Sequence, residues 1–143
     1  MNNLNYLAIF VASIAGFATG AIWFGPKTFF PIWWRAMGRK EDEAAGGSNM
    51  GLVFGLTYVG QLALAFASAV VLNFVFAANS PATTADALGV GLQVGLLLGV
   101  LVAAAASLSH RLFAGHGLKV WLLEVGNDIA AIVVMSLILA AWR

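Results

Sequence analysis

The sequence predicts an all-α integral membrane protein, a four-helix antiparallel bundle in which residues 1–143 form a single transmembrane domain. Hydrophobic residues make up 62% of the chain and charged residues only 9%, whereas an ordinary soluble domain is about 25% charged. The apolar residues also gather in four runs, each long enough for the roughly 20 residues that a membrane-spanning helix needs. These runs cover about residues 4–24, 51–77, 85–109 and 120–142.

The first run predicts a retained spanning helix and not a signal peptide. No Lys or Arg precedes it, and its apolar part is longer than that of a signal peptide. We expect this helix to end before Pro26, because proline has no N–H to donate and disfavours helical geometry in the residue before it.

A short interfacial helix is predicted over about residues 29–37, since Pro31 suits the first turn of a helix. Trp prefers the headgroup region of a bilayer, so we interpret this helix as lying on the membrane surface. The alternative is an aromatic lid or a ligand-stacking site. The predicted membrane-interface anchor consists of Phe30, Trp33, Trp34 and Arg35.

The third run predicts close helix packing. Lipid tails are as apolar as leucine, so membrane helices associate mainly through close approach at small residues. A small residue recurs at every fourth position from Gly91, through Gly95, Gly99 and Ala103, to Ser107. We predict that Gly91, Gly95, Gly99 and Ala103 form a helix-packing stripe, whose partner is another span or another protomer. In the fourth run, Gly126 and Ala130 offer a second face for close approach.

The fourth run contains an unexpected polar group, Glu124, Asn127 and Asp128. The two acids are four residues apart and Asn127 lies between their directions, so a helix places all three on one face. The helical rise puts Asp128 about 13 Å below the surface, near the middle of a ~30 Å hydrocarbon core. An isolated charge there costs several kcal/mol, so the group must be neutral, paired or hydrated. Desolvation and a neighbouring like charge disfavour ionisation, so we expect at least one acid to be protonated.

Possible partners of these acids differ with depth. No Lys or Arg lies deep enough in any span to pair with Asp128, whereas Arg111 or Lys119 could reach Glu124 from the interface. We expect both acids to face the bundle interior or a subunit interface, with Asp128 the more buried and an inner-half polar side chain such as Gln61 within hydrogen-bond reach. The group either binds a proton or a cation, or locks helices together through hydrogen bonds. The candidate residues are Glu124, Asp128, Asn127, Gln61, Thr57 and Ser107.

Charge distribution predicts the orientation and excludes several functions. Six of the seven Lys and Arg residues lie in the loops between spans one and two and between spans three and four. The positive-inside rule therefore predicts that these loops are cytoplasmic and that both termini are outside. A net charge of +1 excludes a nucleic-acid partner. With no Cys and two His residues, we expect neither a metal site nor a cofactor.

Two stretches give the chain a family resemblance. "GAIWFGPKTFFPIWWRAMG" (Gly20–Gly38) and "LKVWLLEVGNDIAAIVVMSLILAAW" (Leu118–Trp142) resemble the span-ending aromatic segment and the closing span of small bacterial membrane proteins known as domain of unknown function 1761. The resemblance implies the four-span fold and a bacterial inner-membrane location, and it brings no established activity. In that pattern asparagine is more usual at the position of Glu124 and an acid is not typical at Asp128.

Two functions follow as hypotheses. The first is a small transporter or channel subunit with a membrane-embedded proton or cation site, which would need a homo-oligomer because four short helices enclose little space. The alternative is a non-catalytic accessory or assembly subunit that packs against a larger membrane protein complex. We do not expect an enzyme, because the sequence offers no activated nucleophile, metal cluster or phosphate-binding loop.

Overall fold

A computed structural model of the chain describes residues 4–40, 42–43 and 49–142, and within these ranges every regular element is helical. Four helices are long and apolar enough to cross a membrane, which confirms the predicted all-α, four-span class. Arg143, which entered the charge comparison, lies outside the described residues. The four candidate spans are α1 (Tyr6–Trp23), α3 (Met50–Asn79), a continuous third span (Thr84–Phe113) and α6 (Gly117–Ala141).

The helices begin and end at local signals in the sequence. Asn5 caps α1 and Asn49 caps α3, each through a side-chain oxygen that accepts a hydrogen bond from a backbone N–H of the first turn. The third span begins with a capping box, in which Thr83 and Asp86 each accept a bond from the other's backbone N–H. These caps place the start of α3 and of the third span one residue before the predicted runs. Ser80, in the left-handed region at φ 43°, then ends α3.

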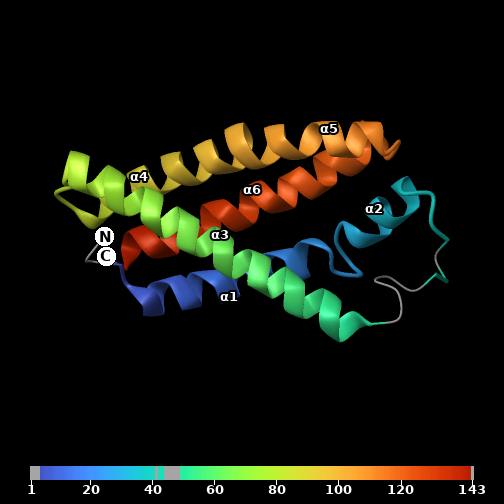
Figure 1. The fold of residues 1–143 in the computed structure, drawn as a ribbon, viewed down its shortest axis with the longest axis horizontal. Helices are drawn as coiled ribbons and strands as arrows, with labels where there is room; N and C mark the ends of the chain where they lie inside the picture. Colours follow the sequence, from blue (N-terminus) through green and yellow to red (C-terminus); the bar gives the residue numbers. More distant parts are fainter. Residues whose placement is uncertain (1–3, 41, 44–48, 143) are drawn as a thin grey trace.

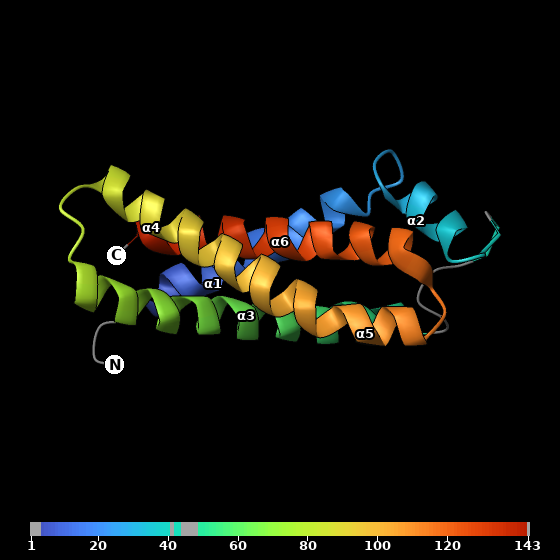
Figure 2. The same cartoon turned by 90° about the horizontal axis from the view of Figure 1, so that it is seen from above.

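All spans pack around α6. It contacts α1, α3, the third span and the short helix α2 (Phe30–Ala36). Figures 1 and 2 show α6 running along the bundle, with the chain termini and the α3–α4 loop at one end and α2 with the α5–α6 turn at the other. We call these the terminal end and the α2 end. The Asn5 side chain donates to the backbone oxygen of Trp142 at 3.1 Å, which ties the two termini together.

The third span is a regular α-helix only in part. It consists of α4 (Thr84–Leu96), a π-helical segment η1 (Leu97–Ala104) and α5 (Ala105–Phe113). Sequence reasoning did not predict η1, yet the four-residue stripe of small residues explains it. On an α-helix, residues four apart point in directions that differ by about 40° around the helix axis. Over the four steps from Gly91 to Ser107 this difference would reach about 160°. A π-helix has a wider turn than an α-helix, so η1 offsets much of this drift.

Contacts with α6 show that the stripe stays on one face. A methyl group at Gly91 would lie 2.7 Å from Ala140 Cβ, and one at Gly99 would lie 3.0 Å from Ile129 Cα. Further along, Ser107 Oγ accepts a hydrogen bond of 3.2 Å from Trp121 Nε1. Ala103 is partly buried and packs against the bundle core. The partner of the stripe is thus α6 of the same chain, which resolves the alternative that the sequence left open.

Packing differs between the two halves of the bundle. The apolar core lies in the half toward the terminal end, where α1, α3, α4 and α6 meet. Toward the α2 end, α5 has no buried residue and the buried residues of α3 begin only at Ala65. The core consists of Ala8, Ile9, Ala12, Ala65, Ala69, Leu72, Val94, Ala131, Ile132, Met135 and Leu139.

Candidate functional site

Glu124 joins three helices at the α2 end of the bundle. It lies in the second turn of α6, and its side chain is 15% exposed. Its Oε2 is 2.6 Å from Nε of Arg111 on α5, and its Oε1 accepts a hydrogen bond of 3.0 Å from Trp33 Nε1 on α2. Of the two interfacial cations that could reach Glu124, Arg111 is the one that pairs with it. Glu124 is therefore a paired carboxylate that holds α2 and α5 against α6.

The aromatic residues of α2 face the protein as well as its surroundings. Trp34 is 7% exposed, and its Nε1 donates to the backbone oxygen of Lys40 at 2.7 Å. Its ring stacks on Phe30 with a centroid distance of 5.4 Å. Both indole N–H groups of the predicted interfacial anchor are thus used within the chain, and among its four members only Arg35 is exposed. The Trp33 bond to Glu124 ties α2 to α6, whereas the contacts of Trp34 lie within residues 30–40.

Asp128 lies one turn further along α6 and has much weaker partners. The side chain is partly buried, and its Oδ1 is 3.4 Å from Asn127 Nδ2, at the long end of hydrogen-bond distances. Among the described residues no Lys, Arg or His lies within 4.0 Å of this carboxylate. The polar side chain within reach of Asp128 is thus Asn127, and Gln61 makes no hydrogen bond to Asp128. The Asp128 carboxylate therefore retains most of its capacity to accept hydrogen bonds or bind a cation.

Two side-chain amides have a buried oxygen in the bundle interior, one adjacent to Asp128 on α6 and one on α3. Asn127 is 8% exposed, and its Oδ1 is buried without a hydrogen-bond donor in the described structure. The Oε1 of Gln61 on α3 is also buried without a donor. Two glycines of α1, one turn apart, make room for these oxygens. A methyl group would lie 3.5 Å from Asn127 Oδ1 at Gly20 and 2.9 Å from Gln61 Oε1 at Gly16.

Such unpaired oxygens are energetically costly. A buried acceptor without a donor costs about 1–3 kcal/mol, so native proteins keep few of them. Ser136 Oγ is a third such atom in the described residues, further toward the terminal end on α6. We call Asp128, Asn127 and Gln61 the inner oxygen group: Asp128 adjoins Asn127 on α6, and the side-chain oxygens of Asn127 and Gln61 lie next to Gly20 and Gly16 of α1.

The remaining candidates do not join this group. Thr57 is exposed and donates to Val53 O of its own helix at 2.7 Å. Ser107 donates to Ala104 O at 3.2 Å and accepts from Trp121. Hydroxyl groups on helices readily bond a carbonyl in the preceding turn, which removes the need for a distant partner. Of the six residues expected in one polar network, Thr57, Ser107 and Glu124 therefore have partners of their own outside the inner oxygen group.

Sequence reasoning missed the role of Trp23. Its Nε1 donates to Leu123 O on α6 at 2.9 Å, and a methyl group at Gly126 would lie 2.7 Å from its ring. Trp23 is the last residue of α1, so the helix that approaches the Gly126 face is α1, through its terminal indole. The sequence did contain a signal for this contact. A Trp at the end of one span and a Gly near the start of another are complementary in size.

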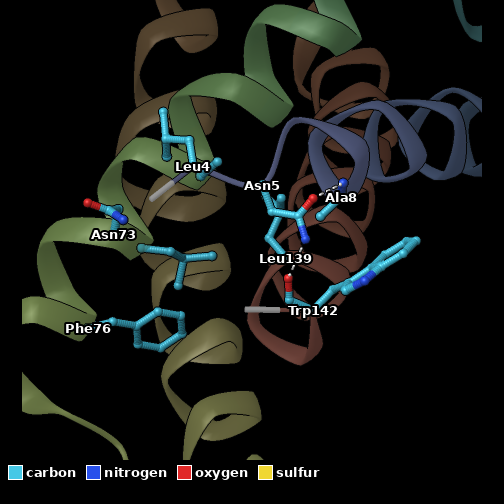
Figure 3. Close-up of a pocket in the computed structure, with 9 residues that line it drawn as sticks. Leu4, Asn5, Ala8, Asn73, Phe76, Leu139 and Trp142 are labelled. Atoms are coloured by element: carbon cyan, nitrogen blue, oxygen red, sulfur yellow. Dashed lines mark hydrogen bonds between the residues drawn. The ribbon is translucent and has the colours of Figure 1, made fainter. Parts of the chain in front are cut away.

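A small cavity lies at the terminal end, away from the inner oxygen group (Figure 3). Its volume is about 60 Å³, which is room for a few water molecules and too small for a drug-sized ligand. Asn5 lies at its edge, with its amide engaged by Ala8 N and Trp142 O. None of the predicted site residues lines this cavity. The lining residues are Leu4, Asn5, Ala8, Ala69, Leu72, Asn73, Phe76, Leu139 and Trp142.

Within the described residues, no group of three or more His, Cys, Asp and Glu side chains is placed to hold a metal ion.

Comparison with known proteins identifies the family of the chain. No curated protein and no solved structure matches the chain. The family described as "Protein of unknown function (DUF1761)" matches residues 7–140, nearly the whole chain. The sequence motifs and the four apolar helices agree with this match, and the chain belongs to that family.

Proposed function

We propose that this membrane protein is a small transporter or channel subunit that binds a proton or a monovalent cation at the inner oxygen group. One observation carries the proposal. Within the described residues, a partly buried carboxylate without an ion-pair partner adjoins the buried Asn127, and the buried Oε1 of Gln61 lies beside a glycine of α1 one turn from the glycine next to Asn127; neither amide oxygen has a donor. Ionisable groups inside a membrane are costly and typically belong to ion or proton pathways.

The chemistry of the group suits such a ligand. Hard cations prefer oxygen ligands, and a carboxylate with two carbonyl-type oxygens provides both charge and neutral coordination. Water molecules bound to a hydrated cation could also donate to Asn127 Oδ1 and Gln61 Oε1, which have no donor in the described residues. Glu124 has a different role in this proposal, because its charge is already neutralised by Arg111.

Loose packing toward the α2 end supports access to the site. The first half of α3 and all of α5 lack buried residues, so the bundle is tightly closed only toward the terminal end. A second copy of the chain against these helices would complete a pathway that four helices alone are too few to enclose. The same exposed helices also favour the second candidate, an accessory subunit packed on a larger complex. Purification in mild detergent separates the two, since a stoichiometric foreign protein supports the accessory role and a homo-oligomer supports transport.

We infer the orientation from the basic residues. Arg35 of α2, Arg111 of α5 and Lys119 in the first turn of α6 belong to elements at the α2 end, so we infer that this end faces the cytoplasm and the termini face outward. A tag at either terminus should be accessible from outside intact cells. Tags accessible only after lysis would contradict this orientation.

Flux into proteoliposomes tests the proposed function. We expect the protein to carry protons or a monovalent cation, measured with an internal pH dye and with ion-sensitive dyes under an imposed gradient. Asp128→Asn should abolish this flux, because the amide can neither ionise nor release a proton. Glu43→Gln is the matched control, since Glu43 pairs with Arg39 on the exposed surface and should retain full flux. Flux no greater than in protein-free vesicles, or equal flux in Asp128→Asn, would overturn the proposal.

A further inference from the structure

A groove between α2 and the first turn of α6 has cations on both sides. It is open to the surroundings, has a volume of about 490 Å³, and is lined by Ile32, Arg35 and Ala36 of α2 and by Lys119 of α6. Arg35 and Lys119 are exposed and line the groove from different helices. The groove lies at the α2 end, beside the first residues of a candidate membrane span.

The charges of this groove are not balanced within the described chain. The ion pairs in the described residues are Arg39–Glu43 and Arg111–Glu124, and neither involves Arg35 or Lys119. Arg35 donates one bond, from Nε to Pro31 O at 3.1 Å, which orients the guanidinium and uses one of its five N–H donors. The nearby Glu124 carboxylate is already paired with Arg111. The groove therefore presents two positive charges with no internal counter-ion.

We propose that this groove binds the phosphate headgroup of an anionic phospholipid, such as phosphatidylglycerol. A phosphate between the two walls would accept a forked pair of hydrogen bonds from Arg35 and an ionic contact from Lys119. Ile32 and Ala36 supply apolar surface against which the glycerol and the first acyl carbons can pack. A basic pocket beside helix ends is the usual form of an anionic-lipid site.

The internal contacts of α2 make this groove a preformed site. Trp33 bonds Glu124 and Trp34 is buried, so the inner face of α2 is fixed to the bundle and its outer face carries Arg35. The relative position of the two helices that carry the cations is thus set before a lipid arrives, which reduces the entropy cost of binding. A free phosphate ion would gain nothing from the apolar walls, and this difference favours a lipid.

Native mass spectrometry of the full-length protein in detergent tests the proposal. Phosphatidylglycerol and phosphatidylcholine are added in turn, and the affinity of each is measured. We expect a higher affinity for phosphatidylglycerol than for phosphatidylcholine. In the double variant Arg35→Gln/Lys119→Gln the affinity for phosphatidylglycerol should fall about 30-fold, because each cation near an anionic headgroup raises that affinity about five-fold. Lys27→Gln/Lys40→Gln is the matched control, since it removes the same charge from exposed residues that do not line the groove.

Three results would overturn the proposal. They are equal affinity for the two lipids, an equal loss in both double variants, and displacement of the lipid by inorganic phosphate at a concentration similar to that of the lipid. The single variant Lys119→Glu gives a second readout, because it places a repelling charge on one wall at an exposed position. It should lose the preference for phosphatidylglycerol while its circular dichroism spectrum stays that of the native helical protein. An unchanged preference in this variant would also contradict the site.

Discussion

Replacing Gly95 by alanine tests the packing of the third span on α6. A methyl group at this position would lie 2.8 Å from Val133 Cα and 3.2 Å from Ser136 Cβ. The first of these atoms belongs to the backbone of α6, so a side-chain rotation cannot relieve the contact. Carbon atoms pack best at about 3.5–4.0 Å, so α4 must move away from α6 by about 1 Å.

The energetic cost follows from this displacement. Forcing an extra methyl group into a well-packed interface costs about 1–3 kcal/mol. Alanine also favours a helix over glycine by up to about 1 kcal/mol, which works in the opposite direction. Gly89→Ala is the matched control on the same helix, because a methyl group there meets nothing within 4 Å. The propensity gain is common to both variants, so Gly95→Ala should be about 1–3 kcal/mol less stable than Gly89→Ala.

Unfolding in mixed micelles measures this difference. The free energy of unfolding is obtained for both variants from circular dichroism as the mole fraction of sodium dodecyl sulfate increases. Equal free energies for the two variants would refute the close approach of α4 and α6. A variant with Gly95→Ala that is more stable than Gly89→Ala would refute it as well.

Two further substitutions test the α2 end of the bundle. Glu124→Gln removes the charge that pairs with Arg111, and we expect a loss of about 1 kcal/mol, because Arg111 is 40% exposed and the pair is partly screened. Trp33 should become more accessible to aqueous quenchers in this variant, and unchanged quenching would argue against the docking of α2. Gly126→Ala places a methyl group 2.7 Å from the Trp23 ring, so the indole must leave its hydrogen bond to Leu123. We expect a change in the near-ultraviolet circular dichroism of this variant, and an identical spectrum would contradict the contact.

Much of the fold could be predicted because the membrane imposes strong constraints on sequence. A spanning helix must be long and apolar, so the four runs were visible in composition alone, and the caps at Asn49 and Thr83 explain the small shifts of the observed ends. The stripe from Gly91 to Ser107 predicted close packing. The same stripe contained a signal for η1 that was overlooked, since five small residues at intervals of four cannot share one face of a regular α-helix.

The candidate site was less predictable, because it depends on how helices meet. The shared face of Glu124 and Asp128 follows from helical geometry. Their different environments depend on contacts with other elements: α5 brings Arg111 and α2 brings Trp33 to Glu124, and neither reaches Asp128. The unpaired oxygens of Asn127 and Gln61 could not be expected from sequence either, because they depend on the close approach of α1 to α3 and α6.

The central claim is that water and cations reach Asp128 from the α2 end of the bundle. The chain has no cysteine, so a single introduced cysteine is the only thiol and its reactivity can be assigned without ambiguity. The decisive measurement is the labelling rate of the Asp128→Cys variant in sealed vesicles with a membrane-impermeant, cationic thiosulfonate. Lys119→Cys is the exposed control at the α2 end, and Met135→Cys is the control in the apolar core, where Met135 is 0% exposed. We expect Asp128→Cys to react from the same side as Lys119→Cys and Met135→Cys to stay unlabelled, whereas an Asp128→Cys variant as inert as Met135→Cys would contradict the account.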